Sequence, residues 1–557
     1  MLTDHDPGST FVSAHGTFFL TVFFFLFVQG CGFDIDELES DRENNAFCLA
    51  VFPMHEDGAK TELAKKWLTW DWPWKLPLVD IKQYFGDEIA FYFTFLGHLT
   101  SGLLFLAGFA VVAQGFSLGT WETDGGAMYA ESFFALLGLG AFFVMLDSWK
   151  YFEGKKAVLW EVHGCRESVP PRPGFKGLVL ENPRTGKIEI DFPNRMRRPR
   201  VQVGQFINFA LSTCMLLTVS AIFVFKRSVR PDDSQFMQLL PTILNSLQIM
   251  FYDALYKYIA TRVTEYENHR TIAEHNSQLF KKLTTFYFLN SYSALFYIAF
   301  VKSECYDPLS GSTFCGRELG VQVLIVFVVN DFLSRMVASV VIPTLSRLWK
   351  QRAASRDETI KSDNIGVIEK QFSFLGRYDA SSNLIFDYIE LYIQWGYLVL
   401  FGASAPIVVV FALITNFIET RADGNKLLFS FRRVVPQRVD GVGEPLITFT
   451  LMCYIAIPVN AGLMVYCFGS FDSWLPDDYR VWVFVGICAI FYGALKVLDV
   501  LFPDLPEASE IQLARMAVVY DRVIKELPDD GYLKVRRCSF MTCNESLHLV
   551  QNILVAK

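Results

Sequence analysis

Ten long apolar stretches constrain the fold of this chain more than any other feature of its sequence. A helix that crosses a bilayer needs roughly 20 mostly apolar residues. The stretches lie near 91–114, 131–148, 203–225, 237–259, 284–301, 318–343, 384–402, 404–420, 446–468 and 481–502. Soluble all-helical proteins do not contain so many runs of this length. The sequence therefore predicts an all-α polytopic membrane protein with about ten transmembrane helices.

The composition agrees with lipid as the solvent and narrows the class of function. Only 19% of the residues are charged and 52% are hydrophobic, whereas about a quarter of the residues of a soluble protein are charged. The net charge of −8 does not favour a nucleic-acid binder. We recognise no nucleophile–base set, nucleotide-binding loop or metalloprotease motif, so we do not predict an enzyme. His163 and His269 are interpreted as surface residues of polar loops.

The distribution of Lys and Arg predicts the orientation of the helices. Loops rich in these residues follow the second, fourth, sixth and eighth stretches, whereas the loops after the first and ninth stretches are poor in them. Basic loops remain in the cytoplasm, so both termini are predicted to be cytoplasmic. The membrane itself is predicted to be the plasma membrane or an endomembrane. The loop that holds Cys305 and Cys315 is then external, where an oxidising compartment would allow a disulfide.

Four carboxylates, which we call the carboxylate cluster, lie near the cytosolic ends of the seventh and eighth helices. Asp387 and Glu390 are three residues apart, and Glu419 and Asp423 are four apart, so each pair shares a helix face. A tight turn at Gly402–Pro406 joins the two helices as a hairpin, which brings both pairs to a similar depth. Each carboxylate within a bilayer costs roughly 2.5–3.5 kcal/mol. A hard cation such as calcium would offset this cost; alternatively, the four are interfacial acids that face water.

Polar side chains recur on one side of the fourth, fifth and sixth helices, and we call this set the polar stripe. Its members are Gln235, Gln238, Thr242, Asn245, Asn290, Asn330, Asp331 and Ser334. Polar residues within a span usually face protein or a water-filled cavity. Two interpretations stay open: hydrogen bonds between helices, worth about 0.6–2 kcal/mol each, or a solvated groove.

Several sequence segments between about residues 51 and 510 resemble segments of one known family, in the same order along the chain. They are VFPMHED (51–57), PLVDIKQYFGDEIAFYFTFLG (77–97), LDSWKYFEGKKAVLWEVHG (146–164), YENHRT (266–271), FDYIELYIQWGYLVLF (386–401), LITNFIETRADGNK (413–426) and LDVLFPDLP (498–506). In this order they resemble landmarks of the anoctamin family of calcium-activated phospholipid scramblases and ion channels. The resemblance implies a homodimer of ten-helix subunits, each with its own membrane-embedded groove.

The resemblance also divides the chain. Residues 51–84 correspond to a remnant of the family's cytosolic N-terminal domain, 85–503 to the ten-helix transmembrane domain, and 504–557 to a short cytosolic tail. Residues 1–50 match nothing in the family. Their apolar stretch at 11–33 is interpreted either as a membrane segment or as a piece of a cytosolic domain.

By this resemblance, the four members of the carboxylate cluster match acidic calcium ligands of the family. A second, smaller acidic set resembles another family calcium site and comprises Asp147, Asp499 and Asp504. The sixth helix departs from the pattern, because Arg335 and Ser339 stand where the family typically has Asn and Glu. Arginine cannot ligate calcium. It either lies among the carboxylates as a built-in cation or pairs with Asp331 one turn away, and fewer calcium ions than usual are expected in both cases.

The function predicted first is a phospholipid scramblase that moves lipids passively through a groove of helices 4–6, with ion conduction and altered calcium control as open features. The first alternative is a chloride or non-selective ion channel on the same scaffold, since both activities need the same groove. The second is a membrane tether without transport. A tether would need a long polybasic or folded tail, whereas the residues after the tenth helix indicate only a modest helix of mixed charge.

Overall fold

The computed structural model describes residues 52–119, 124–163, 172, 175–181, 188–229, 234–302, 315–337, short pieces between 341 and 378, 380–468, 471, 476–501, 503 and 505–523. The apolar stretch at 11–33, the Cys305 loop, Ser339 and Asp504 lie outside these residues.

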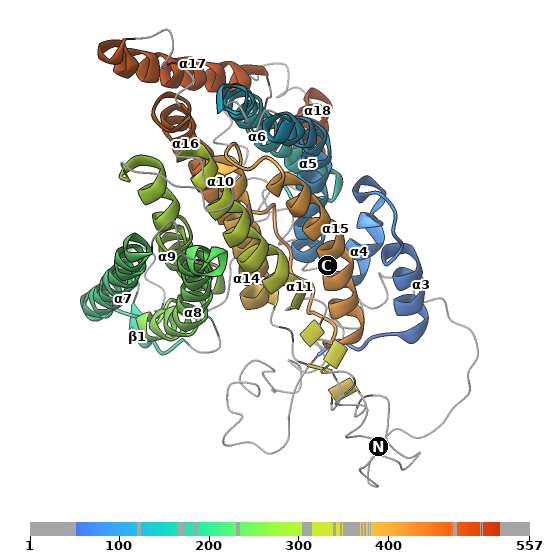
Figure 1. Ribbon diagram of the computed structural model, residues 1–557. Helices are drawn as coiled ribbons and strands as arrows, with labels where there is room; N and C mark the ends of the chain where they lie inside the picture. The colour runs from blue at the N-terminus through green and yellow to red at the C-terminus, as the bar shows by residue number, and fades with distance from the viewer. Residues whose placement is uncertain are drawn as a thin grey trace.

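A bundle of long helices dominates the molecule (Figure 1). Within the described residues, each predicted apolar stretch coincides for most of its length with one of these helices or with a helix and the segment that continues it. These are α5 (Asp87–Gly119), α6 (Asp124–Leu159), α7 (Asn194–Ser228), α8 (Gln235–Glu267), α9 (Ile272–Phe300), α10 (Cys315–Val326), α14 (Ala380–Gly396), α15 (Val408–Phe429), α16 (Glu444–Gly462) and α17 (Arg480–Leu501).

Three of these helices continue into a short π-helical segment. The segments are η2 (Phe327–Leu333) after α10, η4 (Tyr397–Phe401) after α14 and η5 (Leu463–Cys467) after α16. The segment α11 (Ser334–Met336) follows η2 directly. π-helical turns are rare and concentrate at functional sites. The segment η2 carries Asn330 and Asp331 of the polar stripe.

Seven helical segments among the described residues are long and apolar enough to cross a membrane. They correspond to α5, α6, α7, the sixth helix through Met336, α14 with η4, α16 with η5, and α17. The helices α8, α9 and α15 are also long, but they do not reach this level of hydropathy. These three helices carry much of the polar stripe and half of the carboxylate cluster. Their hydropathy is therefore lowered by the polar residues to which we assign a function.

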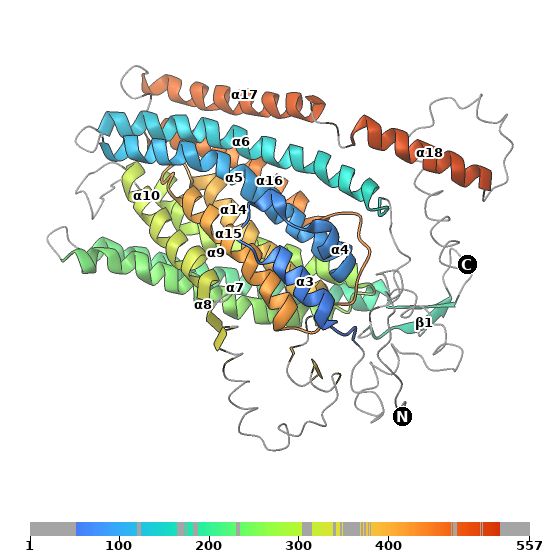
Figure 2. The same ribbon diagram turned by 90° about the vertical axis from the view of Figure 1, so that its right-hand side faces the viewer.

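The smaller elements gather at one end of the bundle (Figure 2). They include α3 (Asp57–Trp67), η1 (Pro73–Lys75) and α4 (Leu78–Phe85) from the start of the described chain, and α18 (Glu507–Val523) from its end. A two-stranded antiparallel hairpin, β1 (Leu178–Glu181) and β2 (Ile188–Asp191), lies there too, with Leu178 opposite Asp191. The purely α-helical prediction missed this hairpin.

Local sequence signals explain where the central helices begin and end. The Ser234 side chain caps α8 by accepting a hydrogen bond from the Met237 amide, and Asn268 ends this helix with a left-handed backbone at φ 56°. Thr271 caps α9 by accepting from the Glu274 amide at 3.1 Å. Between α4 and α5, Gly86 has φ 98°, and a Cβ there would lie 2.9 Å from Pro436, so both the backbone and the space require glycine.

A buried histidine joins the first described residues to the end of the bundle at which the smaller elements gather. The His55 amide donates to Gln371 Oε1 at 2.9 Å, and its ring nitrogens lie 2.8 Å from the Tyr84 hydroxyl and 3.0 Å from the Phe431 carbonyl oxygen. Burial lowers the pKa of His55 from 6.5 to about 4. The ring is therefore neutral at pH 7.

We expect acid to open this junction. Because the fold favours the neutral ring, its contribution to stability is complete above pH 6.5 and is lost as the pH falls towards 4. Hydrogen exchange of the segment 52–56, corrected for the intrinsic exchange rate, should show lower protection near pH 4. His55→Gln removes the titrating group, so protection that still fell to the same extent in this variant would assign the effect to another residue.

Candidate functional site

Arg335 lies inside the carboxylate cluster and is only 4% exposed. Its guanidinium donates to Asp331 Oδ1 at 3.2 Å, and Nη2 donates to Glu419 Oε2. Its Nε also lies 3.7 Å from Glu390 Oε2. Both alternatives for this arginine are therefore present at once: it pairs with Asp331 on its own helix, and it lies among the carboxylates of α14 and α15.

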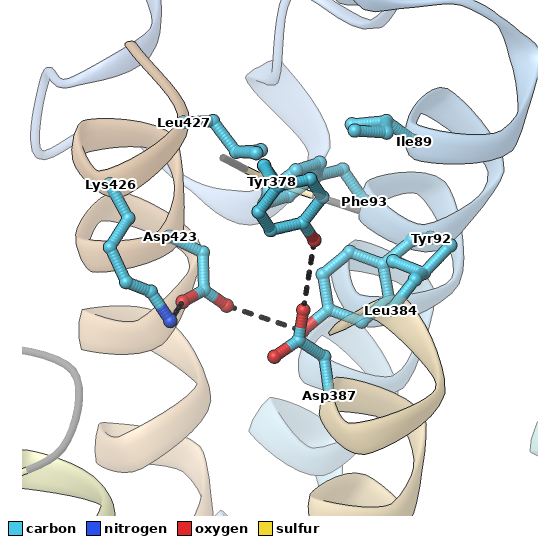
Figure 3. A pocket seen from close by; sticks show the side chains of 9 residues that line it. All are labelled: Ile89, Tyr92, Phe93, Tyr378, Leu384, Asp387, Asp423, Lys426 and Leu427. Carbon is cyan, nitrogen blue, oxygen red and sulfur yellow. Dashed lines mark hydrogen bonds and ion pairs between the residues drawn. The ribbon is translucent and has the colours of Figure 1, made fainter. Parts of the chain in front are cut away.

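A second cation occupies the other half of the cluster (Figure 3). Lys426 Nζ lies 2.8 Å from Asp423 Oδ1, one turn away on α15. The Asp423 Oδ2 atom accepts from the Tyr92 hydroxyl at 3.3 Å, and Asp387 accepts from the Tyr378 hydroxyl at 3.4 Å. These side chains line a small pocket between α5, α14 and α15.

This arrangement does not fit a two-calcium site. Three of the four carboxylates that would coordinate the ions already lie beside a cation: Glu390 and Glu419 beside the guanidinium of Arg335, and Asp423 beside the ammonium of Lys426. Across the described residues, no three His, Cys, Asp or Glu side chains are grouped closely enough to hold a metal ion. Calcium would have to displace at least one built-in cation, since a carboxylate oxygen cannot serve both equally well.

The smaller acidic set is described only in part. Asp147 of α6 is buried, and its Oδ1 lies 2.9 Å from Lys150 Nζ. The side chain of Asp499 and the whole of Asp504 lie outside the described residues. The second calcium site remains a prediction.

Members of the polar stripe bond α8 to its neighbours. The Thr242 hydroxyl donates to Gln322 Oε1 of α10 at 2.8 Å. Asn290 of α9 accepts from Gln248 Nε2 at 2.8 Å and donates to Asp253 Oδ1 at 2.9 Å. The interhelical hydrogen bonds that the sequence left as one interpretation are thus present.

Hydrogen bonds do not satisfy the whole stripe. Asn245 is 3% exposed, and its Nδ2 has no partner among the described residues. Beside the stripe, Gln248 Oε1 of α8 and Ser291 Oγ of α9 are also buried and have no partner among these residues. Gln238, Asn330 and Ser334 are half-buried, and the Gln235 side chain is not described. Polar atoms without a partner are costly in an apolar environment, so these atoms call for water or a polar ligand.

Residues 81–516 match the family model described as "Anoctamin: Calcium-activated chloride channel". The chain belongs to the anoctamin family. Anoctamins are multi-pass membrane proteins, as the seven apolar helices also indicate. Human anoctamin-10 is 26% identical over 488 residues, which cover 84% of this chain and 70% of that protein.

Two other anoctamins are similar over a comparable length. Rat anoctamin-7 is 25% identical over 537 residues, covering 81% of this chain and 60% of that protein. Mouse anoctamin-5 is 24% identical over 536 residues, covering 78% of this chain and 58% of that protein.

The structure adds residues to this anoctamin site that the sequence prediction missed. Lys426 lies three residues after Asp423, a helical spacing that the sequence contained. Gln394 lies four residues after Glu390, and its Nε2 donates to Asp331 Oδ2 at 3.1 Å. Both spacings place a polar side chain on the same helix face as an acid. This spacing is the sequence pattern from which both residues could have been predicted.

One prediction for a loop residue was wrong. His269 is 3% exposed rather than on the surface, and its Nε2 lies 2.9 Å from Glu267 Oε2 while Nδ1 contacts Arg197. The residue follows the C-terminal end of α8, and α9 begins three positions later, so the short connection buries it between the two helices. His163 is half-buried.

Proposed function

We propose that this anoctamin is a phospholipid scramblase whose lipid headgroups cross the membrane along the polar stripe of α8, α9 and the sixth helix. The observation that supports this proposal best is the set of buried polar atoms, in and beside the stripe, for which the described part of the chain offers no partner: Asn245 Nδ2, Gln248 Oε1 and Ser291 Oγ. A headgroup or its water would supply the missing hydrogen bonds, while the acyl chains stay in the lipid.

The contacts around the stripe also suggest how it opens. Thr242 and Gln322 join α8 directly to the sixth helix, so the stripe is covered rather than open to lipid at this level. A single hydrogen bond of this kind is worth only about 0.6–2 kcal/mol in a membrane. Separation of the two helices therefore costs little at this contact and would expose Thr242 and Asn245 together.

Replacing Gln238, Thr242 and Asn245 by leucine should slow lipid flipping. Three lost hydrogen-bond partners at about 1 kcal/mol each amount to roughly a hundredfold in rate. The measurement is loss of fluorescence of labelled lipids in proteoliposomes, with chloride flux recorded in the same vesicles.

Thr213→Leu is the matched control, because this threonine is exposed on α7 and donates only to its own helix, to the Phe209 carbonyl at 2.9 Å. Flipping should be unchanged in this variant. Wild-type protein that conducts ions but never moves lipids, with or without calcium, would replace the scramblase with the channel that the family model's description names.

We infer further that calcium control is weakened. Arg335 and Lys426 already neutralise part of the charge on the cluster, so the closed arrangement of α14, α15 and the sixth helix does not depend on bound calcium for charge balance. A basal activity that needs little or no calcium follows from this.

We also infer a homodimer with both termini in the cytoplasm, without assigning a particular membrane. In the apolar windows of α7 and α17 only 11% and 6% of the residues are buried within one subunit, which leaves apolar faces for lipid or a second copy. A membrane tether without transport is disfavoured, because it gives no role to the unpartnered polar atoms of the stripe.

A further inference from the structure

The connection between α3 and α4 presents three tryptophans on the surface. We call residues 68–76 the tryptophan loop. Trp70, Trp72 and Trp74 are 72%, 50% and 58% exposed. Trp72 and Trp74 stack on each other with ring centroids 5.1 Å apart and an interplanar angle of 4°. Large exposed aromatic groups in one short segment mark a site of interaction.

The loop is held firmly in this position by the chain around it. Trp67, just before the loop, is 1% exposed, and a Cβ at Gly424 of α15 would lie 2.8 Å from its ring. Arg421 of α15 donates from Nε to the Thr69 carbonyl at 3.2 Å and from Nη2 to the Asp71 carbonyl. The exposure of the indoles is therefore a consequence of the fold and not of a loose segment.

The surroundings of the loop indicate what covers it. Trp70 stacks on Phe417 with ring centroids 5.7 Å apart, and Ile414, one turn before Phe417 in α15, is 42% exposed. The indoles thus continue an apolar surface that α15 presents outside the bundle. Exposed Lys65 precedes the loop and exposed Lys75 lies within it, and lysines near a membrane surface favour anionic headgroups.

We propose that the tryptophan loop inserts into the headgroup region of the cytosolic leaflet. Indoles prefer this layer because the ring is apolar and its N–H can hydrogen-bond. The loop then anchors the segment before α5 and, through Arg421 and Trp67, fixes the depth of α15, which bears Glu419 and Asp423. This placement is independent of whether the protein moves lipids or ions.

Tryptophan fluorescence in lipid nanodiscs tests this placement, because both leaflets are open to a soluble quencher there. The emission of the three indoles is obtained as the difference between wild type and the variant Trp70→Phe, Trp72→Phe, Trp74→Phe. We expect this emission to lose most of its intensity in phospholipids brominated near the headgroup, and to respond only weakly to acrylamide.

One further variant serves as a control for the quenching experiment, and another replaces the triple variant if that one does not fold. Trp149→Phe removes an indole that is 0% exposed and packs on Phe95, so its difference emission should respond weakly to both quenchers. Trp72→Phe alone serves if the triple variant does not fold. Strong quenching by acrylamide with none by brominated lipid would overturn the proposal and place the loop in water, free for a protein partner.

Discussion

Arg335→Asn combined with Ser339→Glu is expected to make the activity steeply dependent on calcium and to lower the activity without it. The change removes a positive charge from the cluster and returns an acidic ligand. At an effective dielectric near 20, one charge about 4 Å away is worth roughly 4 kcal/mol, or nearly three decades in calcium affinity. Arg335→Ala alone should reduce the basal activity, because the guanidinium no longer links the sixth helix to α15.

Lipid flipping and ion flux at a series of free calcium concentrations provide the measurement. Lys281→Asn is the matched control, since Lys281 belongs to an exposed pair with Glu444 at 3.1 Å on the protein surface; its calcium response should equal that of the wild type. A wild type that is silent without calcium and activates at micromolar calcium would contradict the assignment of Arg335 as a built-in cation.

The second large effect concerns stability. Arg335→Met should destabilise the protein by roughly 3–5 kcal/mol, because it leaves Glu419 and Asp331 buried without their counter-charge. Both carboxylates are at most 3% exposed, so water cannot replace the guanidinium. Thermal unfolding of the purified protein in detergent, followed by intrinsic fluorescence, should show a clear fall in the transition temperature.

Two further measurements separate charge from packing. Adding Glu419→Gln to Arg335→Met should recover much of the lost stability, because it removes the uncompensated negative charge. Lys281→Met breaks an exposed pair and should cost less than about 1 kcal/mol. If Glu419→Gln gave no recovery, the loss in Arg335→Met would come from packing and not from the ion pairs.

The positions of the long helices along the chain were predictable from the sequence because a bilayer requires long apolar runs. The bounds of those helices were less so, since α8 continues from the predicted end at residue 259 to Glu267, where Asn268 ends it. The requirement for long apolar runs does not determine where a helix ends beyond the bilayer; capping and loop length decide that boundary. The hairpin β1–β2 was missed because its strands are only four residues long; β2 (Ile-Glu-Ile-Asp) does alternate between apolar and polar residues, but a run this short stands out little beside the long apolar stretches.

In the candidate site, contacts within one helix could be predicted from the sequence, whereas contacts between helices could not. The pairing of Arg335 with Asp331 was predictable from a spacing of four residues, as was the proximity of Lys426 to Asp423. The contact between Arg335 and Glu419 joins residues 84 positions apart. Only the tertiary packing of the sixth helix against α15 determines that contact, so the sequence left two alternatives where the structure has both.

The low hydropathy of α8, α9 and α15 has a consequence for the biogenesis of the protein. A helix enters the bilayer from the translocon on its own only when its apolar residues outweigh its polar ones, and each central Asp, Lys or Arg adds about 2.5–3.5 kcal/mol to that cost. These three helices fall short of the hydropathy that the other helices reach. Their integration must therefore wait for apolar neighbours, such as α7 for α8 and α9, and α5 for α15. A substitution on the apolar face of such a neighbour can impair assembly without touching the site.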